Sequence, residues 1–89
     1  MDEARLSLEM ARAAQAERLL QNELLQDAFN AVKAKYEKDW QGSKLDDVNK
    51  RERCFMALRA LDDVLKALET HIVTGKLAKA EVARKAKAN

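Results

Sequence analysis

Few side chains in this 89-residue sequence could serve as a nucleophile or a general base. His71 is the only histidine and Cys54 the only cysteine, and one expected helix holds them about 25 Å apart at about 1.5 Å per residue. A nucleophile and its base must lie within hydrogen-bond distance of each other. The two side chains therefore cannot meet within one chain, and only a site shared between two subunits stays open. We predict that the protein is not an enzyme and has no catalytic residues.

The sequence also lacks the spacings at which protein ligands to a metal ion usually recur. It contains no His-x-x-x-His pair, no Glu-x-x-His step and no Cys-x-x-Cys. The acidic doublet Asp46-Asp47 is more simply a helix cap, and in Asp62-Asp63 the first carboxylate can pair with Lys66 one helical turn later. We therefore expect neither a metal ion nor a cofactor.

The remaining chemistry is that of binding, through arginine guanidinium groups and aromatic rings. A guanidinium can hold a phosphate or carboxylate through its planar fork, and an aromatic ring can stack on a nucleotide base. The candidate ligand-binding residues are Arg51, Arg53, Arg59, Tyr36 and Trp40. The alternative is that the arginines form a solvated face with ion pairs and that the two rings fill a helical hairpin.

The end of the chain is basic although the whole chain carries a net charge of only +2. Five cations against Glu81 give the last fourteen residues +5 − 1 = +4, and the preceding part sums to 12 − 14 = −2. The five cations are Lys76, Lys79, Arg84, Lys85 and Lys87. Such a tail can contact the phosphates of a nucleic acid or an acidic partner, or it can be a solvated and frayed terminus.

Helices must position all of these residues. The sequence has no proline, two glycines and 36% charged residues among many alanines and leucines, which is typical of long helices. Asn22 is expected to cap one helix, Gly42 and Gly75 to end others in the left-handed conformation, and Asp46 or Asp47 to cap the third helix. We predict a single all-α domain over residues 1–89, with helices at about 2–21, 23–41, 47–74 and 76–87.

The second and third expected helices form an antiparallel hairpin, because only a short loop joins them. The third helix carries apolar residues at spacings of 4, 3, 4, 3 and 4, which is the pattern of a coiled-coil seam. This seam consists of Cys54, Leu58, Leu61, Leu65, Leu68 and Ile72. The third helix overhangs the second by about 14 Å, so the first helix, the short last helix or a second subunit must cover its end. The apolar stripe is also broader than one partner helix needs, which predicts a homo-oligomer.

The cellular location can be predicted from the lone cysteine and the N-terminus. A single cysteine forms no internal disulfide and fits a reducing cytoplasm. The charged residues Met1 to Arg5 lead into no continuous apolar run, so we expect neither a signal peptide nor a membrane span. The prediction is a cytoplasmic protein without a membrane partner.

Six short segments carry a resemblance to known proteins. They are Glu17–Leu20, Leu24–Phe29, the Tyr36…Trp40 step, Arg51–Arg53, Leu58–Asp62 and Gly75–Ala78. Together they resemble short helical proteins encoded in the genomes of tailed phages and prophages, which are mostly of unknown function, over a span from Glu17 to about Val82. Such sequences often have an acidic residue and a proline before the second helix, where this one has Asn22-Glu23. The resemblance implies a viral source, and thus the cytoplasm of a host cell, and adds no catalytic residue.

These observations lead to a phage-encoded helical homo-oligomer that acts by binding. In one hypothesis it has an anti-defence role, sequestering an anionic nucleotide signal of bacterial defence at a subunit interface. Alternatively it is a DNA-binding packaging or regulatory subunit, like a small terminase subunit, or a protein–protein antagonist of a host factor. Salt separates the first two hypotheses, because DNA binding through several phosphate contacts weakens steeply as salt rises.

Overall fold

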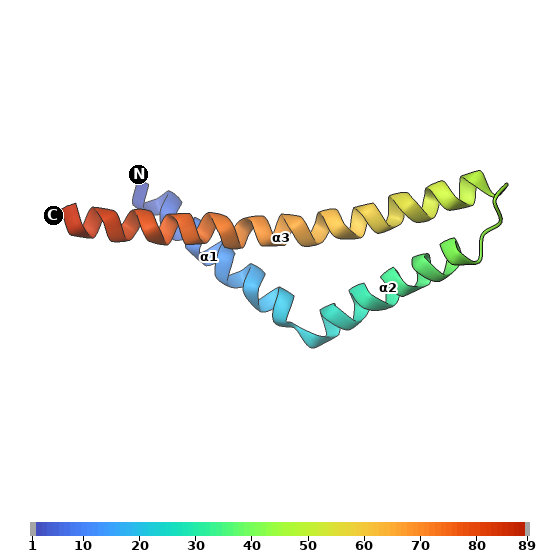
Figure 1. Cartoon of the computed structure of the whole chain (residues 1–89). Coiled ribbons are helices and arrows are strands. Elements are labelled where there is room, and N and C mark those ends of the chain that lie inside the picture. The colour runs from blue at the N-terminus through green and yellow to red at the C-terminus, as the bar shows by residue number, and fades with distance from the viewer. Residues whose placement is uncertain (1, 89) are drawn as a thin grey trace. The chain divides into compact units, whose positions relative to one another are not determined.

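The computed structural model describes residues 2–88 of the chain. It contains three α-helices, which are α1 (Asp2–Gln21), α2 (Glu23–Gln41) and α3 (Val48–Ala88), and no strand within the described residues (Figure 1). The prediction of an all-α fold is therefore confirmed. The predicted bounds of the first two helices also agree with the structure.

Asn22 separates α1 from α2 and caps the second helix. Its backbone is extended, with φ of −70° and ψ of 118°, and its side-chain oxygen accepts a hydrogen bond from the backbone N–H of Leu25 at 2.8 Å. Its carbonyl accepts the first helical bond, from Gln26 N–H at 3.0 Å. Glu23 places a carboxylate in the first turn, near the positive end of the helix. The predicted cap is thus confirmed in its local geometry.

Gly42 ends α2 as predicted, but the expected left-handed conformation is wrong. Its φ of −82° and ψ of −3° lie in the right-handed region, and its N–H donates to the carbonyl of Lys38 at 2.9 Å. The chain thus keeps a nearly helical course for one further residue. Ser43 then closes the turn, because both its N–H and its hydroxyl donate to the carbonyl of Trp40.

Asp47 immediately precedes α3 and occupies the predicted cap position. Its carbonyl accepts the first helical bond, from Arg51 N–H at 3.0 Å. Its carboxylate instead accepts from the backbone N–H of Lys44 at 3.2 Å. The side chain therefore fastens the loop that leads into α3.

The separate helix predicted over 76–87 does not exist, because α3 continues without a break through Gly75 to Ala88. No described glycine has a positive φ, so Gly75 is not a left-handed cap. It is buried instead, and a Cβ atom at this position would overlap the Cβ of Ala13 and lie 3.3 Å from the carbonyl oxygen of Glu9. Glycine is used here to let α1 approach α3 closely.

The described residues group into two compact units. The first unit combines α1 with the part of α3 from Lys66 onward, and the second unit is Asn22–Leu65. The physical reason is the length of α3, whose 41 residues extend over about 62 Å. Helices of 20 and 19 residues are each about half as long, so each covers its own part of α3.

In the first unit α1 runs antiparallel to α3. The ammonium of Lys85 lies 3.3 Å from the carboxylate of Asp2, and the guanidinium of Arg5 lies 3.2 Å from that of Glu81. The residues buried in this unit are Leu6, Ala13, Ala16, Gly75 and Ala78. Of the three candidates for covering the end of the third helix, α1 is thus the one that packs there.

Candidate functional site

The predicted seam faces the neighbouring helices but is only partly covered by them. Cys54 is 4% exposed, while the other five seam residues are half-buried. Those five are Leu58, Leu61, Leu65, Leu68 and Ile72. In the second unit Cys54 is the one buried residue, and α2 contributes no buried residue. This helical hairpin therefore leaves most of its apolar side chains in partial contact with solvent.

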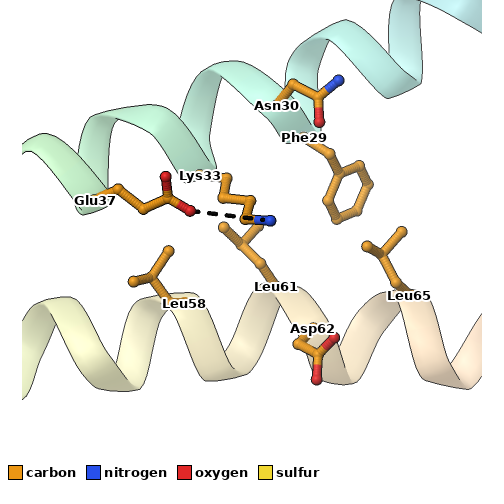
Figure 2. Close-up of a pocket in the computed structure, with 8 residues that line it drawn as sticks. All are labelled: Phe29, Asn30, Lys33, Glu37, Leu58, Leu61, Asp62 and Leu65. Carbon is orange, nitrogen blue, oxygen red and sulfur yellow. Dashed lines mark ion pairs between the residues drawn. The ribbon is translucent and has the colours of Figure 1, made fainter.

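The second unit contains an open apolar cavity, which we call the hairpin groove. Four apolar residues, Phe29, Leu58, Leu61 and Leu65, line a space of about 260 Å³ between α2 and α3. In Figure 2 the ring of Phe29 points from α2 toward α3, and the three leucines point back toward α2. The polar residues on its rim are Asn30, Lys33, Glu37 and Asp62.

The rim of the hairpin groove carries charges of both signs. The ammonium of Lys33 lies 3.9 Å from the carboxylate of Glu37, one helical turn along α2, and both side chains are at least half-exposed. The carboxylate of Asp62 turns away from α2 in Figure 2. The groove is therefore apolar at its centre and nearly neutral at its edge, which suits an apolar partner rather than an anion.

A second cavity, the loop-end depression, lies at the beginning of α3. Leu45, Val48, Arg51, Glu52 and Phe55 line a space of about 280 Å³. Leu45 is 90% exposed and Phe55 is 63% exposed. The coiled-coil spacing of the seam includes neither Leu45 nor Phe55. The loop-end depression therefore exposes large apolar residues to solvent.

A third cavity, the basic groove, lies on another side of the same hairpin and is more polar. It has a volume of about 350 Å³ and is lined by Tyr36, Asp39, Lys50, Arg53, Cys54 and Ala57. The structure thus brings together two predicted ligand residues, Tyr36 and Arg53. It adds Lys50, which could have been found from its spacing of three residues to Arg53 on one helical face.

The other predicted ligand residues lie apart from the basic groove. The guanidinium of Arg51 stands 5.1 Å from the centroid of the Trp40 ring, a cation–π contact that occupies one face of that ring. Trp40 is 45% exposed. Arg59 is exposed and lines none of the three cavities described here. Of the five predicted residues, Tyr36 and Arg53 line one cavity together.

The basic tail is the last part of α3 and is helical to Ala88. Lys85 is paired with Asp2, whereas Lys76, Lys79, Arg84 and Lys87 are exposed. Nearby on α1, hydrogen bonds to Glu9 and then to Glu81 raise the pKa of Arg5 above its already high usual value. Acid–base pairs thus tie α1 to this part of α3, and the four other cations face solvent.

The only histidine and the only cysteine of the chain lie in different surroundings. His71 is exposed on α3, whereas the thiol of Cys54 is buried. Within residues 2–88 no three His, Cys, Asp or Glu side chains gather as they would around a metal ion. None of the described helices combines the length and the apolar character needed to cross a membrane.

Comparison with known proteins adds no family to these observations. No protein-family model, curated protein or solved structure matches the chain. The resemblance to tailed-phage proteins therefore stays a prediction, and what the chain binds has to be inferred from the shape and charge of its own surfaces.

Proposed function

We propose that this chain is a non-enzymatic, phage-encoded helical protein that assembles with copies of itself and acts by binding. The observation that carries the proposal is the shortage of buried apolar side chains. Of the large hydrophobic residues within the described chain, only Leu6 is fully buried. At least 40% of the residue surface stays exposed at Leu8, Leu19, Leu24, Val32, Trp40, Leu45, Val48, Phe55, Met56, Val64, Val73, Leu77 and Val82.

Exposed apolar area on this scale favours association. Removing apolar surface from water contributes about 25 cal/mol per Å², and a chain of this length buries only about 60–65% of its unfolded surface on its own. Small proteins with so modest a core commonly gain stability from a second subunit. The same surface that is costly in an isolated chain becomes the interior of an assembly.

Sedimentation equilibrium at about 1–100 μM protein tests self-association. Dissociation constants in this range correspond to binding free energies of about 5–8 kcal/mol in magnitude. We expect a mass that is a multiple of 10.1 kDa at the upper end of this range. We also expect the midpoint of thermal unfolding to rise with protein concentration, because mass action links assembly to stability. A pure monomer throughout, with a midpoint independent of concentration, would refute the proposal.

The ligand that the basic groove favours is a small anion with an aromatic ring, such as a nucleotide. Its volume of about 350 Å³ lies within the range of about 300–1,000 Å³ that small-molecule sites occupy. Lys50 and Arg53 can hold phosphate oxygens, the ring of Tyr36 can stack on a base, and Asp39 can accept from an exocyclic amine. A phage protein with such a site would sequester a nucleotide signal of host defence.

Nucleic-acid binding is the second candidate, and the exposed cations of the tail favour it. Lys76, Lys79, Arg84 and Lys87 lie within a few turns of one helix, and none of them lines the basic groove. A helix with several exposed cations can follow a phosphate backbone without reading the sequence of the bases. This candidate corresponds to a packaging or regulatory subunit.

Two matched charge reversals, Arg53→Glu and Lys79→Glu, separate these ligands. Calorimetry with AMP should show binding that Arg53→Glu weakens about tenfold or more, the loss of one charge-assisted contact, and that Lys79→Glu leaves unchanged. Fluorescence anisotropy with a labelled DNA duplex should show no binding at 200 mM salt. If the duplex binds, loses affinity steeply between 50 and 200 mM salt and responds to Lys79→Glu alone, the second candidate replaces the first.

A further inference from the structure

A second row of residues runs along α3 and shares Leu58 and Leu65 with the seam, and all of it lies in the second unit. Its members are Val48, Arg51, Phe55, Leu58, Asp62 and Leu65, at spacings of 3, 4, 3, 4 and 3. This is again the coiled-coil period, so the six residues share one face of the helix. The first three line the loop-end depression and the last three line the hairpin groove. The two cavities are therefore neighbours along one surface.

The order of apolar and charged positions in this second row is the same when it is read from either end of the helix. From either end it presents an apolar residue, a charged residue and another apolar residue, and the midpoint falls between Phe55 and Leu58. The two charged positions are of opposite sign, because Arg51 precedes the midpoint and Asp62 follows it. An antiparallel copy of the row is thus complementary to the row itself.

We infer that the second row is the interface between two copies of the chain, which pair antiparallel about a two-fold axis. In this arrangement Val48 faces Leu65 of the other copy, Phe55 faces Leu58, and Arg51 faces Asp62. Each contact occurs twice, because a two-fold interface uses the same patch on both subunits. The inference rests on the proposed self-assembly and specifies which surface carries it.

The shapes of the two cavities support a second copy as the occupant. Phe55 is 63% exposed and lies next to the midpoint of the row, where it can act as a knob. Phe29 of α2 and Leu58, Leu61 and Leu65 of α3 bound the hairpin groove, an apolar hollow that can receive an apolar side chain. Its volume of about 260 Å³ is smaller than the sites that small ligands occupy. Because Phe55 faces Leu58 of the other copy, each knob meets the other groove.

The charges on this surface also favour a copy of the chain over a nucleic acid. The cavity rims hold Arg51 and Lys33 as cations and Glu52, Glu37 and Asp62 as anions, which gives 2 − 3 = −1. A surface that binds phosphate backbones is strongly positive. The Arg51 guanidinium already lies over Trp40 and keeps N–H groups in its plane that can donate to a carboxylate. The stacked guanidinium can therefore still form an ion pair with Asp62 of the other copy.

Charge reversal in two separate variants tests the antiparallel pairing. In Arg51→Asp the interface brings two pairs of acids together, and in Asp62→Arg it brings two pairs of cations together. We expect each variant alone to have a dimer dissociation constant roughly 10- to 100-fold above that of the unaltered protein. An equimolar mixture of the two should recover nearly the original constant, because every acid then faces a cation, and native mass spectrometry should find the mixed dimer.

Recovery of the dissociation constant in the mixture cannot come from an ion pair between residues 51 and 62 of one chain. Residues 51 and 62 are about 16 Å apart along α3 at about 1.5 Å per residue, which is too far for an ion pair. Asp63→Arg is the matched control, because it makes the same change one position beyond the row at an exposed site. It should leave the dissociation constant within about twofold of the original. Circular dichroism at 222 nm checks that all variants keep their helices.

A cross-linking measurement gives a second test that does not depend on the charges. With Cys54 replaced by alanine, the double variant Phe55→Cys/Leu58→Cys should form a disulfide-linked dimer on oxidation, whereas Val64→Cys, outside the row, should not. If the unaltered protein assembles but neither charge reversal weakens the dimer, this interface alone is overturned. The same holds if the protein assembles but the mixture shows no recovery and no cross-link forms. A monomeric unaltered protein would overturn the proposed self-assembly as well.

Discussion

Replacing Leu6 by alanine should lower the free energy of unfolding by about 2–5 kcal/mol, the usual loss when a fully buried leucine is truncated. Leu6 is 2% exposed and is the largest fully buried side chain within the described residues. The other fully buried residues of the first unit are small, so Leu6 supplies most of the apolar volume buried there. Urea unfolding followed by circular dichroism at 222 nm measures the loss.

Leu8→Ala is the matched control for this prediction. It makes the same change two residues later in α1, at a side chain that is 57% exposed. Its cost should be within about 0.5 kcal/mol, as for most surface substitutions. Amide hydrogen exchange should show that Leu6→Ala loosens α1 and the end of α3 that it covers. Equal losses for the two variants would contradict the role of Leu6 as the centre of the first unit.

The parts of the fold that the sequence predicts well are those that depend on local chemistry. The Asn22 cap uses a side-chain oxygen and a backbone N–H three residues apart, so the four residues from Asn22 to Leu25 contain the interaction. The bounds of α1 and α2 follow from this cap and from Gly42, which lacks a side chain where the helix ends. Helix periodicity likewise places the seam on one face of α3.

Gly75 shows what the sequence cannot supply. A glycine followed by a lysine after a periodic apolar row looks like the end of a helix, yet α3 continues through it. The deciding contact is with Ala13, which is distant in the sequence and lies on another helix. A glycine that ends a helix and one that admits a neighbouring backbone have the same letter, so only the tertiary structure distinguishes them.

The candidate site was predictable in its residue types but not in its grouping. Arginines and aromatic rings near the loop are visible in the sequence, whereas the stacking of Arg51 on Trp40 requires their positions in space. Tyr36 and Arg53 meet because α2 and α3 are antiparallel with a particular register. The second row of α3 is harder to recognise in the sequence, because Arg51 and Asp62 interrupt its apolar residues. Its spacing is as regular as that of the seam.

Gly75→Ala should destabilise the first unit although alanine is the better helix former. The substitution favours the helical backbone of α3 by about 1 kcal/mol. Against this, the new Cβ would overlap the Cβ of Ala13, and crowding of a close-packed contact costs about 1–3 kcal/mol. The neighbour on α1 is a short side chain with no rotamer to change, so the backbone of α1 must move away. We expect the crowding to prevail, with a net loss of up to about 2 kcal/mol and faster hydrogen exchange in α1.

Two further variants show whether crowding is the cause. Gly42→Ala places a Cβ at an ordinary 3.4 Å from the carbonyl oxygen of Lys38, at a φ that alanine adopts without strain, and should be neutral or stabilising by up to about 1 kcal/mol. In the double variant Ala13→Gly/Gly75→Ala the methyl group changes sides of the contact, while the number of helical glycines stays the same. Its stability should return to within about 0.5 kcal/mol of the original, because contacting residues couple in this way. If Gly75→Ala stabilises the protein as Gly42→Ala does, helix propensity prevails, and the close approach of α1 to α3 is not what requires glycine at this position.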